Sequence, residues 1–310
     1  MRLMILGGLS LCATGCALTT RPTLPPGIMA ELWQEPADLE HRDLFYGAGG
    51  ARRAPDPNDR QQFLGAKATG TQPGYDVKDS RGRQWSVKMG PEARVEVVVS
   101  RVVWAVGYHQ PPAYYLPRWT LVRDGRSVVQ EGGRFRLEQP TTKKVSMWSW
   151  RKSPFMGTRP LAGLFVLMVI FNNWDLKAAQ NAVYQVGPDG EDAPQRYMVR
   201  DLGASLGKTA WPTFGNKDNP DDFDREPFIL GVEGNRVRFG YQDGWFEPQL
   251  LNSVVPDDVR WICRLLARLS PKQWSDAFRA GGFTDQEAER YIRRLREKVA
   301  QGLHFDASSP

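Results

Sequence analysis

The chain has 310 residues, enough to bury a sizeable core in one large domain or in two closely packed lobes. Its hydrophobic content of 41% and charged content of 25% are ordinary for a globular protein, and no repeat of the solenoid or propeller kind is present. The net charge is +6, but the basic residues are spread along the chain, so the sequence does not indicate a nucleic-acid partner.

The N-terminus has the organisation of a secretory signal. Basic Arg2 precedes the apolar stretch Leu3–Leu11, which is shorter than the roughly 20 residues of a membrane-spanning helix. Ala13-Thr14-Gly15-Cys16 resembles a lipobox, which implies a signal peptide at 1–15, a lipidated Cys16 and a tether at 16–27. The protein is then expected in the cell envelope, on the periplasmic or surface face, held on a membrane by its lipid. The alternatives are ordinary signal cleavage and a buried N-terminal strand.

The cysteines and histidines exclude several classes of site. If Cys12 leaves with the signal and Cys16 is acylated, Cys263 has no intrachain partner, and no disulfide framework is expected. Cys263 lies within an apolar helical pattern, which predicts a core position. The three histidines are far apart, with no Cys or Glu at ligand spacing, which argues against structural zinc. With only three histidines, a Ser-His-Asp hydrolase would also have little choice of catalytic histidine.

Regular structure is predicted from Gly74 onward. Residues 75–78 and 84–89 alternate in polarity around the turn Asp79-Ser80-Arg81-Gly82, which predicts a β-hairpin whose second strand closes at Lys88. Pro91 then begins a helix in which valines recur at three- and four-residue spacing until Gly107. Valine is a mediocre helix former, so this helix must be held by burial.

Further strands and helices follow in chain order. Strand-like segments at 119–123 and 134–138 precede a helix that opens at Arg159-Pro160 and is almost wholly apolar to Phe171. Its eleven apolar residues suit a buried core helix rather than a membrane span. A second hairpin is predicted over 182–199. Three C-terminal helices are expected to begin at residues 257, 270–271 and 284, the last with a Thr–Glu capping box.

A set of charged residues recurs along these elements in a fixed order. Lys88 ends a strand, Glu92 and Glu96 lie on the next helix, and Asp175 follows the buried helix. Asn181 and then Asp201-Leu202-Gly203 come later, the latter at the exit of the second hairpin. Magnesium-dependent phosphoryl transfer needs such groups: a lysine for phosphate charge, carboxylates and an amide for Mg²⁺, and an aspartate for the attacking hydroxyl.

This order resembles the protein-kinase-like superfamily, in particular atypical branches such as the phosphatidylinositol kinases and the bacterial toxin-type serine kinases. The resemblance covers about residues 70–207. It implies an α+β, two-lobed fold, with a small antiparallel β lobe at 28–145 and a mainly helical lobe at 146–310. It also implies roles for individual residues: Lys88 on phosphate and paired with Glu96, Asp175 as base or hydroxyl orienter, Lys177 on the transferring phosphate, and Asn181 and Asp201 on metal.

The sequence departs from the family pattern at four places. No His-Arg-Asp triplet is present, because Asn173-Trp174 precedes Asp175. Asn181 comes six residues after Asp175, one more than the usual spacing, and Leu202 replaces the usual phenylalanine. The glycine-rich loop is represented only by Gly65, Gly70 and Gly74.

The leading functional hypothesis is an ATP- and Mg²⁺-dependent phosphotransferase acting on a protein or small-molecule hydroxyl. The alternative is a non-catalytic envelope lipoprotein, either a pseudokinase or a module that binds a partner or glycan through aromatic surface segments. Those segments are Tyr114-Tyr115, Trp148-Ser149-Trp150 and Trp245-Phe246. Taken singly, each charged residue could also have a purely structural role: Lys88 at a solvated strand edge, and Asp175 or Asn173 as the cap of a short helix.

Overall fold

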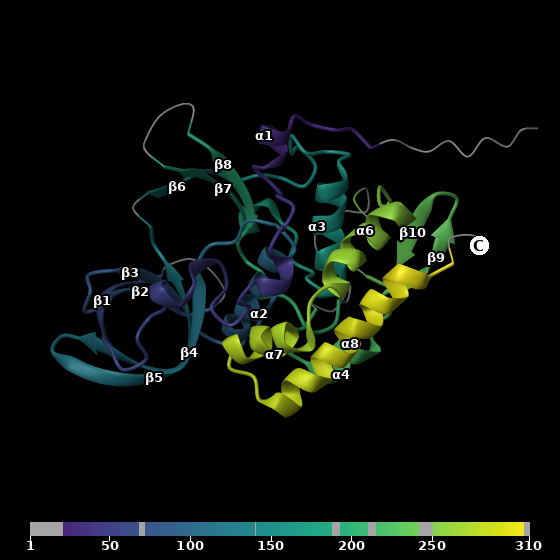
Figure 1. The fold of residues 1–310 in the computed structure, drawn as a ribbon. Helices are drawn as coiled ribbons and strands as arrows, with labels where there is room; N and C mark the ends of the chain where they lie inside the picture. The colour runs from purple at the N-terminus through teal and green to yellow at the C-terminus, as the bar shows by residue number, and fades with distance from the viewer. Residues whose placement is uncertain are drawn as a thin grey trace, which may run out of the picture.

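The computed structural model describes residues 21–67, 72–139, 141–187, 193–209, 215–241, 250 and 252–306. The predicted signal with Cys16, the predicted glycine Gly70, and Trp245-Phe246 lie outside the described residues. The fold is a mixture of helices and strands, as predicted, with a β-rich part followed by a mainly helical C-terminal part (Figure 1). Within the described ranges, the search for a helix long and apolar enough to cross a membrane finds none.

The β-rich part is built around a closed barrel with strand order β1-β2-β3-β5-β4. Its strands are β1 (Arg60–Ala66), β2 (Gly74–Lys78), β3 (Gln84–Lys88), β4 (Ala113–Arg123) and β5 (Arg126–Leu137). Neighbours pair antiparallel, except that β1 closes the barrel by pairing parallel with β4. The predicted hairpin is β2–β3, and the predicted strands at 119–123 and 134–138 are parts of the longer β4 and β5.

Alternation along β3 decides which side chains face the barrel interior. Trp85 and Val87 are fully buried and pack with Phe135 of β5 inside the barrel. Because successive side chains of a strand point to opposite faces, Ser86 and Lys88 are directed out of the barrel. There they meet helix α2 (Glu92–Ala105), the valine-rich helix predicted from the sequence.

Burial holds α2 in place. All six of its valines have no exposed surface, and the helix contacts β4, β5 and the C-terminal helix α7 (Pro271–Ala280). The unfavourable helix propensity of valine is small, a few tenths of a kcal/mol to about 0.7 kcal/mol per residue, against roughly 1.5–3 kcal/mol for burying each side chain. Packing therefore decides the conformation.

A second sheet and a buried helix lead the chain into the helical part. The sheet has the order β6-β7-β8, with β6 (Thr142–Ser146), β7 (Asn181–Val186) and β8 (Gln195–Val199). Helix α3 (Arg159–Ile170) begins at Thr158, whose side chain accepts a hydrogen bond from the Leu161 amide at 3.3 Å. Ten of its residues are buried, as its continuous apolar sequence predicts.

In Figure 1, two of the three C-terminal helices lie along one side of α3, and the third lies below α2. The three are α6 (Pro256–Ala267), α7 and α8 (Asp285–His304), and α3 contacts both α6 and α8. The predicted capping box of α8 is present: the Thr284 side chain accepts from the Glu287 amide while Glu287 accepts from Thr284. The remaining elements are α1 (Pro26–Met29), η1 (Leu39–His41), η2 (Gly47–Gly49), η3 (Ala51–Arg53), η4 (Ala178–Gln180), α4 (Pro220–Arg225), β9 (Ile229–Glu233) and β10 (Arg236–Phe239).

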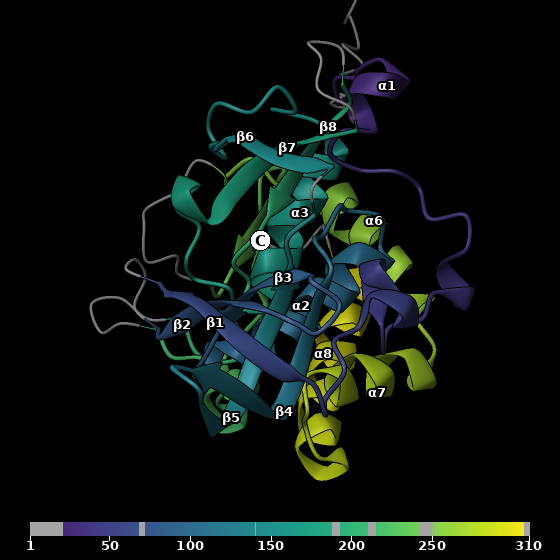
Figure 2. The ribbon, with the colours of Figure 1, turned by 90° about the vertical axis from the view of Figure 1, so that its left-hand side faces the viewer.

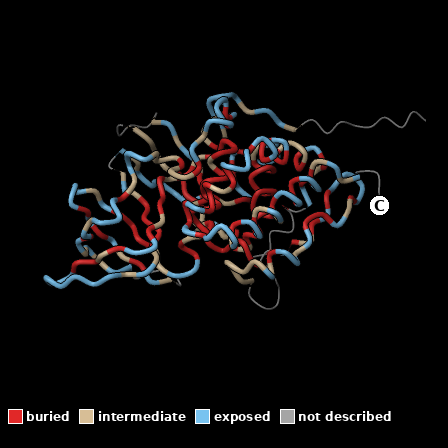
Figure 3. Tube along the Cα trace, turned by 60° about the horizontal axis from the view of Figure 1, so that its bottom comes forward, coloured by how far each residue is buried: buried red, intermediate tan, exposed pale blue. Residues whose placement is uncertain are grey.

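The larger core runs through the helical part, and the barrel holds a smaller one. Buried chain follows the middle of the molecule, while the ends of the long barrel strands are exposed (Figure 3). Cys263 is fully buried in the larger core, which confirms its predicted packing role. Figure 2 shows the barrel below the three-stranded sheet, with the segment after α1 descending along one side towards the barrel.

Candidate functional site

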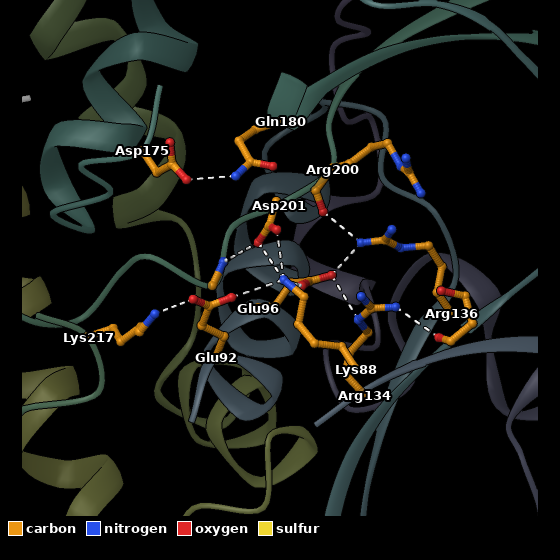
Figure 4. A network of polar contacts seen from close by, with 12 residues as sticks. Lys88, Glu92, Glu96, Arg134, Arg136, Asp175, Gln180, Arg200, Asp201 and Lys217 are labelled. Carbon is orange, nitrogen blue, oxygen red and sulfur yellow. Dashed lines mark hydrogen bonds and ion pairs between the residues drawn. The ribbon is translucent and has the colours of Figure 1, made fainter. Parts of the chain in front are cut away.

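Lys88 stands at the centre of a cluster of charged side chains between the barrel, α2 and the segment after β8 (Figure 4). Its Nζ lies 2.7 and 2.8 Å from the two carboxylate oxygens of Asp201, 3.0 Å from Glu96 and 3.2 Å from Glu92. The Lys88 side chain is only 15% exposed, so it is not a solvated strand edge. The predicted Lys88–Glu96 pair is therefore present, and Asp201 joins it.

Glu96 is the most deeply buried carboxylate of the cluster. It is 2% exposed and pairs with Lys88, with Arg134 at 3.0 Å and with Arg136. Burial alone would raise the pKa of Glu96, but Arg134 and Lys88 reverse this and hold it well below its usual value. Burial lowers the pKa of Lys88, but Glu96 and Asp201 outweigh it and raise that pKa. Both groups are thus charged at neutral pH.

The two arginines come from β5 and share a face with the lysine. Register pairs Arg134 with Lys88 and Arg136 with Ser86, so all four side chains leave the barrel on the side of α2. The Nη1 of Arg134 donates to the Ser86 carbonyl at 3.0 Å, and the Nη2 of Arg136 donates to the Arg200 carbonyl at 2.8 Å. The sequence analysis placed these arginines in a strand but assigned them no role.

Glu92 connects the cluster to a distant segment. Its carboxylate pairs with Lys217 as well as with Lys88. Four cations thus face three carboxylates, namely Lys88, Arg134, Arg136 and Lys217 against Glu92, Glu96 and Asp201. This balance leaves a local excess of positive charge, which suits an anionic ligand such as a phosphate.

The turn at Asp201 brings its carboxylate to Lys88. The Gly203 amide donates to Asp201 Oδ1 at 3.2 Å. A Cβ added at Gly203 would lie 2.7 Å from Cβ of Glu92, so only glycine permits this close approach to α2. The Asp-Leu-Gly sequence is therefore more than a common turn here, because its last residue sets the distance between the segment and the helix.

The loop after α3 carries the second predicted carboxylate. Asn172 adopts a left-handed conformation with φ of 54°, which ends the helix and turns the chain. The buried Lys298 amine fixes this turn by donating to the Ile170 carbonyl at 3.0 Å and to Asn172 Oδ1 at 2.8 Å. Asn173 Oδ1 then accepts from the Asp175 amide at 3.1 Å, an Asx-type turn rather than the cap of a longer helix.

The structure brings Asp175, Lys177 and Gln180 together. Asp175 Oδ2 accepts from Gln180 Nε2 at 2.6 Å and lies 3.0 Å from the Lys177 Nζ. The Gln180 carbonyl in turn accepts from the backbone amides of Arg200, at 2.8 Å, and Asp201, at 3.4 Å. Asp175 and Asp201 are thus linked through one residue, and Figure 4 shows the Asp175–Gln180 pair beside the Lys88 cluster.

Gln180 was not predicted as a site residue, although its spacing from Asp175 in the sequence indicates one. It comes five residues after Asp175, which is the spacing of the kinase catalytic-loop motif. The predicted Asn181 sits at the start of β7, 1% exposed, and its Nδ2 donates to the Trp148 carbonyl at 3.1 Å. Among the described residues its side chain contacts Trp148 rather than the Lys88 cluster, whereas Gln180 holds the carboxylate of Asp175.

Two buried oxygens at this place lack hydrogen-bond donors among the described residues: Asp175 Oδ1 and Asn181 Oδ1. Oxygens of this kind are the ligands that Mg²⁺ takes, usually one or two carboxylates completed by substrate phosphates and water. The described ranges contain no group of three His, Cys, Asp or Glu that could hold a metal ion by itself. Asp201, whose side chain is 27% exposed, is the carboxylate of the cluster that is accessible to a cation arriving with an anionic ligand.

The aromatic segments of the alternative hypothesis belong largely to the core. Tyr114 is 5% exposed, Trp148 5% and Trp150 1%. Tyr114 packs against Trp85 at a ring distance of 6.0 Å, and Trp148 lies 5.0 Å from Trp150. These side chains are not available as a surface for a partner or a glycan.

Comparison with known proteins gives similarities of shape only. No family model and no curated protein matches the chain. Among solved structures, the proinflammatory kinase CtkA of Helicobacter pylori superposes with a TM-score of 0.45 at 10% identity, over 78% of this chain and 95% of that one.

Two further solved structures are also kinases. The Golgi casein kinase with Mn and ADP bound gives a TM-score of 0.37 at 11% identity, over 82% of this chain and 74% of that one. The complex of the Rio2 kinase from Chaetomium thermophilum with ADP, Mg²⁺ and phosphoaspartate gives 0.30 at 12% identity, over 77% and 72%. Because all three scores are below 0.5, function is inferred here from the geometry of the site.

Proposed function

We propose that the chain is an ATP- and Mg²⁺-dependent phosphotransferase that acts on a hydroxyl group of a protein or a small molecule. The observation that carries this proposal is the meeting of Lys88, Glu96 and Asp201, which come from a strand, the next helix and a segment more than a hundred residues later. Protein kinases require a strand lysine paired with a helix glutamate and an aspartate directed at Mg²⁺.

Each residue has a role that its surroundings support. Lys88, held by Glu96, would donate to phosphate oxygens, and Asp201 would supply an oxygen ligand for the metal. Asn181 Oδ1, which has no donor among the described residues, is the second ligand that the kinase-like order implies. Asp175 Oδ1, which has no donor among the described residues, accepts the proton of the acceptor hydroxyl. Lys177, 40% exposed beside Asp175, offsets charge on the transferring group. Bound Mg-ATP would supply the phosphoryl group.

A thermal-shift experiment with millimolar Mg-ATP tests nucleotide binding. Binding to the folded state alone raises the melting temperature by mass action. We expect a rise in the parent chain that is lost in Lys88→Ala and Asp201→Ala. Two substitutions at exposed positions serve as matched controls. Lys78→Ala removes a strand lysine, and Asp124→Asn changes a turn residue with a left-handed backbone, a conformation that asparagine tolerates.

Transfer itself is tested with γ-labelled ATP and the chain as its own acceptor, followed by generic protein acceptors. Label incorporated by the parent and absent from Asp201→Ala supports the proposal. A thermal shift without any transfer would instead indicate a nucleotide-binding pseudokinase. No shift and no transfer would refute the proposed function.

We also propose that the chain is an exported lipoprotein anchored through Cys16, which rests on the lipobox resemblance. Mass spectrometry of the mature N-terminal peptide should find a diacylglyceryl cysteine at position 16, and Cys16→Ser should move the protein from the membrane fraction to the soluble one. An unmodified N-terminus at Met1 would overturn this.

A further inference from the structure

A cavity of about 300 Å³ shares Arg136 with the Lys88 cluster. One wall is the segment before the barrel, with Arg53, and another is the end of α2 and its connection to β4, with Trp104 and His109. The end of β5 and the β7–β8 hairpin complete it. Arg136 lines the cavity, whereas Lys88, Glu96, Asp175 and Asp201 do not, so the cavity is separate from the candidate active site.

The walls carry an excess of positive charge. Arg53, Arg136 and Arg196 line the cavity together with a single carboxylate, Glu138. Arg136 is 7% exposed, and its Nε has no hydrogen-bond partner among the described residues. Beside the cavity, burial and then Arg136 lower the pKa of Arg200. Like charges are therefore crowded here without enough carboxylates to offset them.

Aromatic rings provide the other half of the site. Trp104 of α2 and Tyr184 of β7 line the cavity, and both are only half-buried. Each ring already has a guanidinium near it: that of Arg200 lies 5.8 Å from the centroid of the Tyr184 ring, and that of Arg42 lies 4.8 Å from the centroid of the Trp104 ring. A volume of this size is at the lower end of the range for small-molecule sites, which are usually apolar with a few charged groups that fix orientation.

We propose that this cavity binds a small organic anion with a flat aromatic ring. The ring packs against Trp104 and Tyr184, and the negative group pairs with the exposed Arg53 and Arg196. Arg136 also lines the cavity and its Nη2 holds Glu96, so the cavity and the Lys88 cluster share this guanidinium. The site is a second ligand site, and it does not depend on the proposed phosphotransfer.

Calorimetric titration of the full chain with naphthalene-2-sulfonate tests the proposal. We expect one site per chain, and binding about ten-fold weaker in the double variant Arg53→Gln/Arg196→Gln, because two exposed charge contacts are lost. Both arginines are exposed, so the fold should tolerate the change. The matched control is Arg81→Gln/Arg126→Gln, which removes the same charge from exposed positions outside the cavity.

The neutral naphthalene-2-sulfonamide keeps the ring but lacks the negative charge, so comparing its affinity with that of the sulfonate measures the contribution of the charge. Weaker binding of the sulfonamide supports the proposal, and equal binding of both compounds overturns it. Absence of binding at millimolar sulfonate, or equal loss of affinity in the control variant, also overturns it. Sulfonate binding that persists in Asp201→Asn shows that the cavity is independent of the candidate active site, whatever the outcome of the nucleotide experiments. Loss of binding in that variant refutes a separate site.

Discussion

Replacing Glu96 by Gln removes the one carboxylate shared by three cations. The substitution keeps the size of the side chain but leaves Lys88, Arg134 and Arg136 facing one another, with Glu96 only 2% exposed to solvent in the parent. Water cannot screen the resulting repulsion, because Arg134 and Arg136 are nearly as buried, at 3% and 7% exposed. We therefore expect a large loss of stability, although the substitution creates no void in the core.

The magnitude follows from the burial of the group. Removing one partner of a buried ion pair costs about 3–5 kcal/mol. With about 2–4 °C of melting temperature per kcal/mol for a large domain, the variant should melt roughly 6–20 °C below the parent. The control Glu131→Gln breaks an ion pair with Arg118 whose side chains are 72% and 73% exposed, and such pairs contribute at most about 1 kcal/mol.

The pH dependence of the folding stability gives a second test of the role of Glu96. The folded pKa of Glu96 is held below its ordinary value, so its stabilising contribution is complete above the unfolded pKa of about 4.3 and is lost as the pH falls towards the folded pKa. Urea unfolding of parent and variant should therefore differ by a constant amount from pH 7 to pH 5, and the difference should narrow only below that. A variant that melts within experimental error of the parent at pH 7 would refute this account of the cluster.

Under the proposed function, Asp175→Asn should lower phosphoryl transfer by at least about 100-fold and leave the Mg-ATP thermal shift intact; a lost shift would contradict the assigned role. Gln180→Ala should lower transfer by about ten-fold, because it frees the Asp175 side chain to rotate; an unchanged rate would contradict it. Burial lowers the pKa of Lys298 far below its usual value, so the unfolded chain binds more protons and stability rises from pH 7 to 9. Urea unfolding should find that rise reduced in Lys298→Met. Burial raises the pKa of Cys263 to about 12, so iodoacetamide should alkylate its peptide roughly 1,000-fold more slowly in the native chain than in urea, as read by mass spectrometry.

Local signals predicted most elements of the fold. The β2–β3 hairpin, the valine helix α2, the apolar helix α3 and the capping box of α8 are each encoded within a few turns of chain, and the structure confirms them. The closure of the barrel was missed. It depends on parallel pairing of β1 with β4, whose partners Arg60 and Thr120 are far apart in sequence. Strand β1 also carries the polar Gln61 at a fully buried position, which hides the usual alternation.

The candidate site was predicted only in part, because some of its contacts, like the closure of the barrel, depend on how distant strands pair. The order of Lys88, Glu96 and Asp201 along strand, helix and hairpin exit predicted their meeting, because each element was itself predictable. The roles of Arg134 and Arg136 depend on which face of β5 meets α2, and that face is set by pairing with β3. Two like charges at alternate positions of one strand do indicate a shared carboxylate opposite them, and this could have been inferred.

The unequal burial of the three carboxylates around Lys88 has a consequence for how the site would bind a nucleotide. Glu96 pairs with two arginines as well as with Lys88 and is 2% exposed, whereas Asp201 is 27% exposed and pairs with Lys88. Exchanging a partner costs less for the more exposed group, because water can solvate it during the change. Under the proposed function, Asp201 is therefore the carboxylate that would hold the metal, and Glu96 is the one that would keep Lys88 in place. Of the two ion pairs of Lys88, the pair with Glu96 is the one expected to persist when the ligand binds.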